Sequence, residues 1–132
     1  AETLFGNGPS GVTGNDDLGT MSAWYLFSAL GMYPDAPGSG RFLLHAPRFA
    51  RAEIDLPQGR VLRIEAPEAK PGERHFVKSV SLAGRPVSRV WLDWEQLQAA
   101  GTLNYQLAPQ PDMAGWGTRG SDLPRPPAGI TP

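Results

Sequence analysis

The segment that follows Asp17 constrains the fold most, because it carries no charged residue until Asp35. Apolar residues recur in it at helical spacing, and the intervening positions are mostly apolar as well. Gly31 and Pro34 are typical signals for the end of a helix. The pattern predicts a helix from about Leu18 or Thr20 to Leu30. Since such a helix has no polar face, we expect it to be buried on all sides.

Short runs with a period of two follow this segment and predict strands. They span residues 41–46, 52–56, 61–65, 76–82, 87–92 and 102–107, and a short helix is predicted at 93–101. We therefore expect an α+β fold that is mainly β, with one buried helix packed on an antiparallel sheet or a small β-sandwich.

Three parts are predicted along the chain. Residues 1–34 form an acidic loop and a helix, residues 35–108 an antiparallel β portion, and residues 109–132 a Pro-rich tail. The tail has few apolar anchors, so we expect its last dozen residues to be disordered.

Composition excludes several classes of function. The net charge of −1 argues against a nucleic-acid partner, which requires a basic surface. Cysteine is absent, which rules out disulfides and thiolate metal sites. No run reaches the ~20 apolar residues of a membrane span, and the first residues lack the pattern of a signal peptide. Because the chain also begins without Met, we expect a piece of a longer protein.

Asp16 and Asp17 are the first candidates for chemistry. A carboxylate before a helix commonly caps its free backbone N–H groups, which is worth ~0.3–2 kcal/mol. A cap needs one carboxylate, however, and here Asn15, Asp16 and Asp17 stand together in a Gly-flanked loop. Such a group also suits a hard cation, although the calcium-binding EF-hand pattern is not matched. Capping and chemistry both remain open from the residues alone.

Other motifs are weaker. Residues 6–11 match a G-x-G-x-x-G dinucleotide fingerprint, but no helix follows directly and Pro9 interrupts it. His45 and His75 lack a partner at metal-ligand spacing, which favours packing or surface roles. Trp116, in a Gly-flanked loop, is the tryptophan that we expect to be most open to a sugar.

The long motif around the acidic pair resembles the C-terminal signature of glycoside hydrolase family 92. It reads GNDDLGTMSAWY from residue 14, continued by FSALGMYP and PGS, with weaker similarity in LPQG, SLAGRP, GTL and WG, so that it covers about residues 5–117. The family comprises calcium-dependent, inverting, exo-acting α-mannosidases, often specific for α-1,2 linkages. It combines a β-sandwich domain with an (α/α)6 barrel.

The resemblance implies that this chain is the end of that barrel plus a C-terminal β-rich portion. The rest of the parent enzyme would be its partner and would cover the apolar helix. It further implies a periplasmic or extracellular location and a mannose-containing oligosaccharide as the substrate. The isolated chain would be inactive, because the general acid, a glutamate, lies upstream.

The resemblance also implies roles for the acidic motif. Asp17 corresponds to the general base that activates water, with Asp16 as the second choice and Asn15 as a substrate contact beside them. Calcium would be bound near the reacting sugar by ligands that lie largely outside this chain. Inverting hydrolysis needs two carboxyls ~6.5–9.5 Å apart on opposite faces of a sugar, which adjacent residues cannot supply.

An alternative is a non-catalytic β-module that binds carbohydrate through exposed tryptophans such as Trp116. A third alternative is a structural portion whose uncovered helix promotes self-association.

Overall fold

The computed structural model describes residues 5–8, 11–12, 15, 17–36 and 38–125 of the 132-residue chain. In chain order, the elements are η1 (Asp17–Gly19), α1 (Thr20–Leu30), β1 (Met32–Pro34), β2 (Arg41–Leu44), β3 (Arg51–Leu56), η2 (Pro57–Gly59), β4 (Arg60–Glu65), β5 (Phe76–Leu82), β6 (Arg85–Val87), β7 (Trp91–Asp93), α2 (Trp94–Ala100), β8 (Thr102–Ala108) and η3 (Gly120–Asp122). The mainly β composition that the sequence predicts is confirmed.

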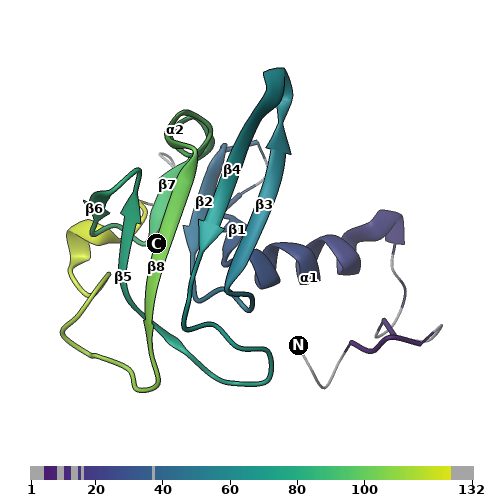
Figure 1. Cartoon of the computed structure of the whole chain (residues 1–132), viewed down its shortest axis with the longest axis horizontal. Coiled ribbons are helices and arrows are strands. Elements are labelled where there is room, and N and C mark those ends of the chain that lie inside the picture. The colour runs from purple at the N-terminus through teal and green to yellow at the C-terminus, as the bar shows by residue number, and fades with distance from the viewer. Residues whose placement is uncertain (1–4, 9–10, 13–14, 16, 37, 126–132) are drawn as a thin grey trace.

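The strands form two sheets, and in Figure 1 the strands of the smaller sheet lie behind those of the larger one. One has the order β1-β2-β7 and the other the order β3-β4-β8-β5-β6. The neighbours are antiparallel except β4 and β8, which run parallel with Ile64 opposite Leu103. The prediction of a purely antiparallel sheet is therefore wrong at this pair. A long connection through β5, β6, β7 and α2 makes the parallel pairing possible.

The strand predicted at residues 87–92 is in fact two strands in different sheets. Arg85–Val87 pairs with β5, whereas Trp91–Asp93 pairs with β2. The chain thus crosses between the sheets within four residues, which holds their edges together. Periodicity alone does not distinguish one strand from two short strands that change partners.

The core lies between these elements. Its most deeply buried side chains come from β1, β4, β7, α2 and β8; they are Met32, Leu62, Ile64, Leu92, Leu97, Leu103 and Tyr105. Helix α2 begins after Asp93, whose backbone N–H donates to Oε1 of Gln96 at 3.2 Å, and ends at Gly101. This capping arrangement matches the predicted short helix.

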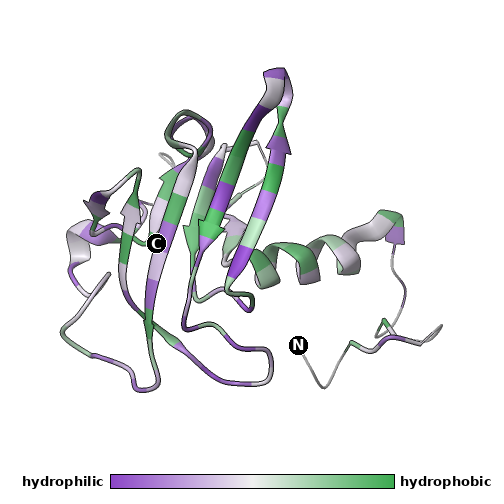
Figure 2. Ribbon diagram, viewed as in Figure 1, coloured by the Kyte–Doolittle hydropathy of each residue, from purple (hydrophilic) through white to green (hydrophobic). Residues whose placement is uncertain are grey.

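Helix α1 projects away from both sheets (Figure 1). Only Ala29 in it is buried, whereas Leu26 is 55% exposed and Trp24 is 37% exposed. The expectation of a buried helix packed on the sheet is therefore wrong for this chain by itself. Figure 2 colours much of α1 as hydrophobic, which explains why the sequence predicts burial. Such a helix needs other segments to cover it, and the described residues do not supply them.

The described part of the tail packs against the sheets. The indole N–H of Trp116 donates to the carbonyl of Val87 at 2.8 Å, and the carbonyl of Asp122 accepts from the N–H of Val90 at 3.0 Å. Residues 126–132, which make up most of the predicted disordered end, lie outside the described residues.

Candidate functional site

Asp17 lies at the end of the molecule formed by the free end of α1. It begins the 3-10 turn η1, and its side chain is exposed. Two left-handed residues follow it, Leu18 with φ 52° and Gly19 with φ 77°. The Thr20 hydroxyl donates to the Asp17 backbone carbonyl at 2.7 Å and thereby closes the turn.

This geometry bears on whether Asp17 caps the helix or is available for chemistry. The residue in the N-cap position of α1 is Gly19, which has no side chain, and among the described residues Asp17 contacts the first turn through its backbone carbonyl. The carboxylate of Asp17 thus does not perform the capping role that its position in the sequence suggested. Asn15 is also exposed, while Asp16 lies outside the described residues. Asn15 and Asp17 leave polar oxygens available to a ligand or to another segment.

The opposite end of α1 is fixed to the sheets. Gly31 adopts φ 81° and its N–H donates to the carbonyl of Phe27. The Gly31 carbonyl accepts both the Tyr105 hydroxyl at 2.8 Å and the His45 backbone N–H at 2.9 Å. The acidic turn is consequently displayed at the tip of a helix whose base is attached to the core.

A short hairpin packs beside the first turns of α1. Phe5 pairs with Val12 in an isolated bridge, and its ring stacks on Trp24 and lies against Tyr25. A cavity of about 230 Å³ between hairpin and helix is lined in part by Asn7, Ser22 and Tyr25. The described residues of the segment that matched the dinucleotide fingerprint thus belong to this hairpin and do not open a helix.

The described residues do not contain a complete metal centre. Among them, no group of three or more His, Asp or Glu side chains is arranged to hold an ion. Asn15 and Asp17 have oxygen donors of the kind that calcium prefers, but two ligands are too few for a site. These donors fit a calcium site only if further oxygens come from other segments.

The structure does not bring Trp116 near the acidic turn. Trp116 lies in the loop after β8, on the side of the sheets away from the tip of α1 (Figure 1). It is half-buried, not exposed as expected, because its ring packs against the core and its N–H is bonded to Val87. Trp116 and Asp17 therefore belong to separate surfaces.

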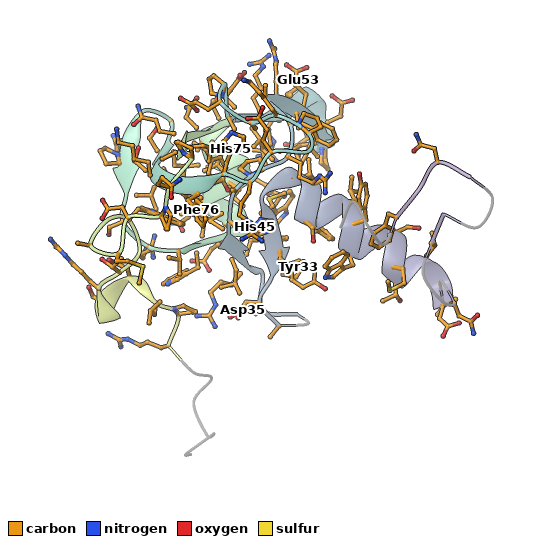
Figure 3. All side chains as sticks on the ribbon, turned by 90° about the horizontal axis from the view of Figure 1, so that it is seen from below. Tyr33, Asp35, His45, Glu53, His75 and Phe76 are labelled. Atoms are coloured by element: carbon orange, nitrogen blue, oxygen red, sulfur yellow. The ribbon has the colours of Figure 1, made fainter. Side chains whose placement is uncertain are left out.

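No pattern in the sequence indicated that His45 and His75 line one cavity. They line it together with Phe76, Asp112 and Trp116, and Figure 3 shows His45, His75 and Phe76 grouped in the sheet region. The residues come from the ends of β2 and β5 and from the loop after β8. These three segments are distant in the sequence and come together only when the two sheets are assembled.

Comparison with known proteins identifies the family. Residues 1–109 match the model of the glycosyl hydrolase family 92 catalytic domain. The chain is 28% identical over 122 residues to an uncharacterized secreted glycosidase of Arthroderma benhamiae, covering 91% of this chain and 16% of that protein.

Solved structures agree with this match. A family GH92 alpha-mannosidase from Bacteroides thetaiotaomicron superposes with a TM-score of 0.83 at 25% identity, over 94% of this chain and 16% of that one. A family GH92 inverting mannosidase from the same organism gives a TM-score of 0.82 at 30% identity, over 93% and 16%.

The chain therefore belongs to glycosyl hydrolase family 92, as its acidic motif predicts. It spans about one-sixth of the length of the relatives that it matches. No helix among the described residues is both long enough and apolar enough to cross a membrane.

Proposed function

We propose that this chain is the C-terminal part of an inverting exo-α-mannosidase that hydrolyses α-1,2-linked mannosides. The observation that carries the proposal is an exposed carboxylate, Asp17, that caps no helix and lies within the family's motif. Two relatives with solved structures are an alpha-mannosidase and an inverting mannosidase, which supports the proposed sugar and the proposed stereochemical course.

Asp17 acts as the general base in this proposal. Its carboxylate accepts a proton from water while the water oxygen bonds to the anomeric carbon and the bond to the leaving oxygen breaks. A carboxylic acid on the opposite face of the sugar protonates that leaving oxygen. Asp16 and Asn15 orient the water and the sugar beside Asp17. The acid comes from sequence outside this chain.

Calcium is proposed as the cofactor, with most of its ligands supplied by other segments of the enzyme. A bound calcium ion would supply a positive charge that attracts the oxygens of sugar hydroxyls. The oxygen donors of Asn15 and Asp17 suit such an ion, and the lack of a complete cluster among the described residues is consistent with ligands from elsewhere.

The uncovered face of α1 supports the proposal that the rest of the enzyme packs there. Leu26, Trp24 and Tyr33 are exposed apolar side chains on or beside this helix. Burying one such side chain is worth roughly 1.5–3 kcal/mol. We infer that upstream barrel helices cover α1 and deliver the general acid to the acidic turn. A periplasmic or extracellular location is proposed from the secreted relative.

The test uses the full-length enzyme that contains this chain, with α-1,2-mannobiose and calcium. We expect hydrolysis in which β-mannose is the first anomer detected by proton NMR, and a loss of about 10²–10⁴-fold in kcat for Asp17→Asn. Asp55→Asn, an exposed carboxylate on β3, is the matched control and retains activity. Release of α-mannose first, or turnover by residues 1–132 alone, contradicts the proposal.

A further inference from the structure

The cavity between the ends of β2 and β5 is separate from the acidic turn. It measures about 360 Å³, and we call it the histidine pocket, defined by His45, His75, Phe76, Asp112 and Trp116. These residues lie at the ends of β2 and β5 and on the loop after β8, on the part of the molecule opposite the tip of α1 (Figures 1 and 3). A cavity of this size is large enough for a small ligand, since ligand pockets commonly measure about 300–1,000 Å³.

The two imidazoles of the pocket are held by neighbours. His45 Nδ1 lies 3.3 Å from the carbonyl of Ala46, so that Nδ1–H donates and Nε2 remains an acceptor. Burial lowers the pKa of His45, which keeps this ring neutral at pH 7. His75 Nε2 lies 3.5 Å from a carboxylate oxygen of Glu73, and the side chain of His75 is only 10% exposed. The hydrogen bond to Ala46 restrains the ring of His45, and burial restrains the ring of His75, so ordering these side chains around a ligand costs little entropy.

The remaining lining is mostly apolar. Phe76 and Trp116 contribute aromatic surface, and the hydrogen bond from the Trp116 indole to Val87 fixes the plane of that ring. Asp112 adds a carboxylate that accepts the N–H of Ala114 at 3.0 Å through one oxygen. Aromatic walls with a few fixed polar groups are typical of sites for small organic ligands.

The charges of the residues that line the histidine pocket favour some classes of ligand over others. Of the described residues, neither a Lys nor an Arg lines the pocket, and the carboxylate of Asp112 disfavours an anion. A metal ion lacks a third ligand, because the described residues hold no such cluster. A pyranose sugar matches both surfaces, since its C–H face packs on aromatic rings and its hydroxyls both donate to and accept from imidazole and carboxylate.

We propose that the histidine pocket binds a neutral pyranose as a non-catalytic site. The proposal does not depend on hydrolytic activity, because none of the pocket residues belongs to the acidic motif. It assigns a role to Trp116 at a location where that residue cannot serve Asp17.

The experiment is a titration of ¹⁵N-labelled residues 1–132 with methyl α-D-mannopyranoside, followed by amide chemical shifts. The dispersion of the free spectrum reports that the chain is folded. We expect saturable shifts centred on residues 44–46, 75–77 and 111–116, with a Kd on the order of 1 mM, or about −4 kcal/mol. His75→Gln and Asp112→Asn, each with a dispersed spectrum, weaken binding at least fivefold. Asp55→Asn, on the exposed face of β3, leaves it unchanged.

Three outcomes overturn the proposal. The first is no saturable shift up to 50 mM sugar, and the second is a set of shifts confined to residues 15–22, which places the sugar at the acidic turn. The third is stronger binding of inorganic phosphate than of the sugar, which would define an anion site. Loss of hydrolysis by Asp17→Asn in the full-length enzyme, with pocket binding intact, distinguishes the two proposals.

Discussion

The hydroxyl of Tyr105 on β8 donates to the carbonyl of Gly31 at 2.8 Å and joins the centre of the larger sheet to the end of α1, 74 residues earlier in the chain. Tyr105 is 1% exposed, so this bond is shielded from water. Because the carbonyl also accepts from the N–H of His45, Tyr105→Phe leaves it with a partner. We expect that variant to lower the free energy of unfolding by about 0.5–1.5 kcal/mol in chemical denaturation. A loss above about 3 kcal/mol would show that the hydroxyl does more than make this bond.

The same hydroxyl predicts a dependence on alkaline pH. Burial raises the pKa of Tyr105 well above its usual 10. Above pH 10 the unfolded chain releases this proton while the folded chain keeps it, so the free energy of unfolding falls as pH rises, by up to about 1.4 kcal/mol per pH unit. Tyr105→Phe should flatten the fall between pH 10 and 11.5. Equal slopes for the two proteins would refute this assignment.

The structure leaves no room for a side chain at Gly31. Its φ is 81°, and a Cβ there would lie 2.8 Å from the carbonyl oxygen of His45 and 2.6 Å from the ring of Pro47. We expect Gly31→Ala to cost about 2–5 kcal/mol, from left-handed strain plus overpacking. Gly84 is the control, because its φ is 77° but nothing lies within 4 Å of its Cβ position. Gly84→Ala should cost only about 1–2 kcal/mol in the same denaturation experiment.

Leu26 tests whether other segments cover α1. It is 55% exposed in this chain, so Leu26→Ser should change the free energy of unfolding of residues 1–132 by less than about 0.5 kcal/mol. In the full-length enzyme the same variant should cost roughly 1.5–3 kcal/mol, because a buried apolar side chain is lost. A similar, small effect in both proteins would mean that α1 remains uncovered.

Local pattern predicted most of the elements but less of their assembly. The strand at residues 76–82 and the helix after Asp93 follow from alternation and capping residues, and β5 has the predicted bounds. The parallel pairing of β4 with β8 and the change of sheet between Val87 and Trp91 depend on contacts between distant segments. Alternation within one strand carries no information about its partner.

The acidic motif was recognisable because its residues are contiguous, and the family that it predicts is confirmed. The meeting of His45 and His75 in one cavity was not recognisable, since the two lie 30 residues apart, next to strands of different sheets. The exposure of α1 has a different cause. Its sequence predicts a helix that is covered on all sides, whereas the described residues include only the base to which it is attached.

Asp17 is the proposed general base, and the pH dependence of hydrolysis tests this role. The most direct measurement is the dependence of kcat/KM on pH for the full-length enzyme and its Asp17→Asn variant, with Asp55→Asn as the control. A general base must be ionised to accept a proton from water, so the native enzyme should lose activity on the acidic side of its pH profile. We predict that Asp17→Asn lowers kcat/KM at least 100-fold and abolishes this acidic limb. A variant that keeps the limb and at least a third of the native activity would contradict the account.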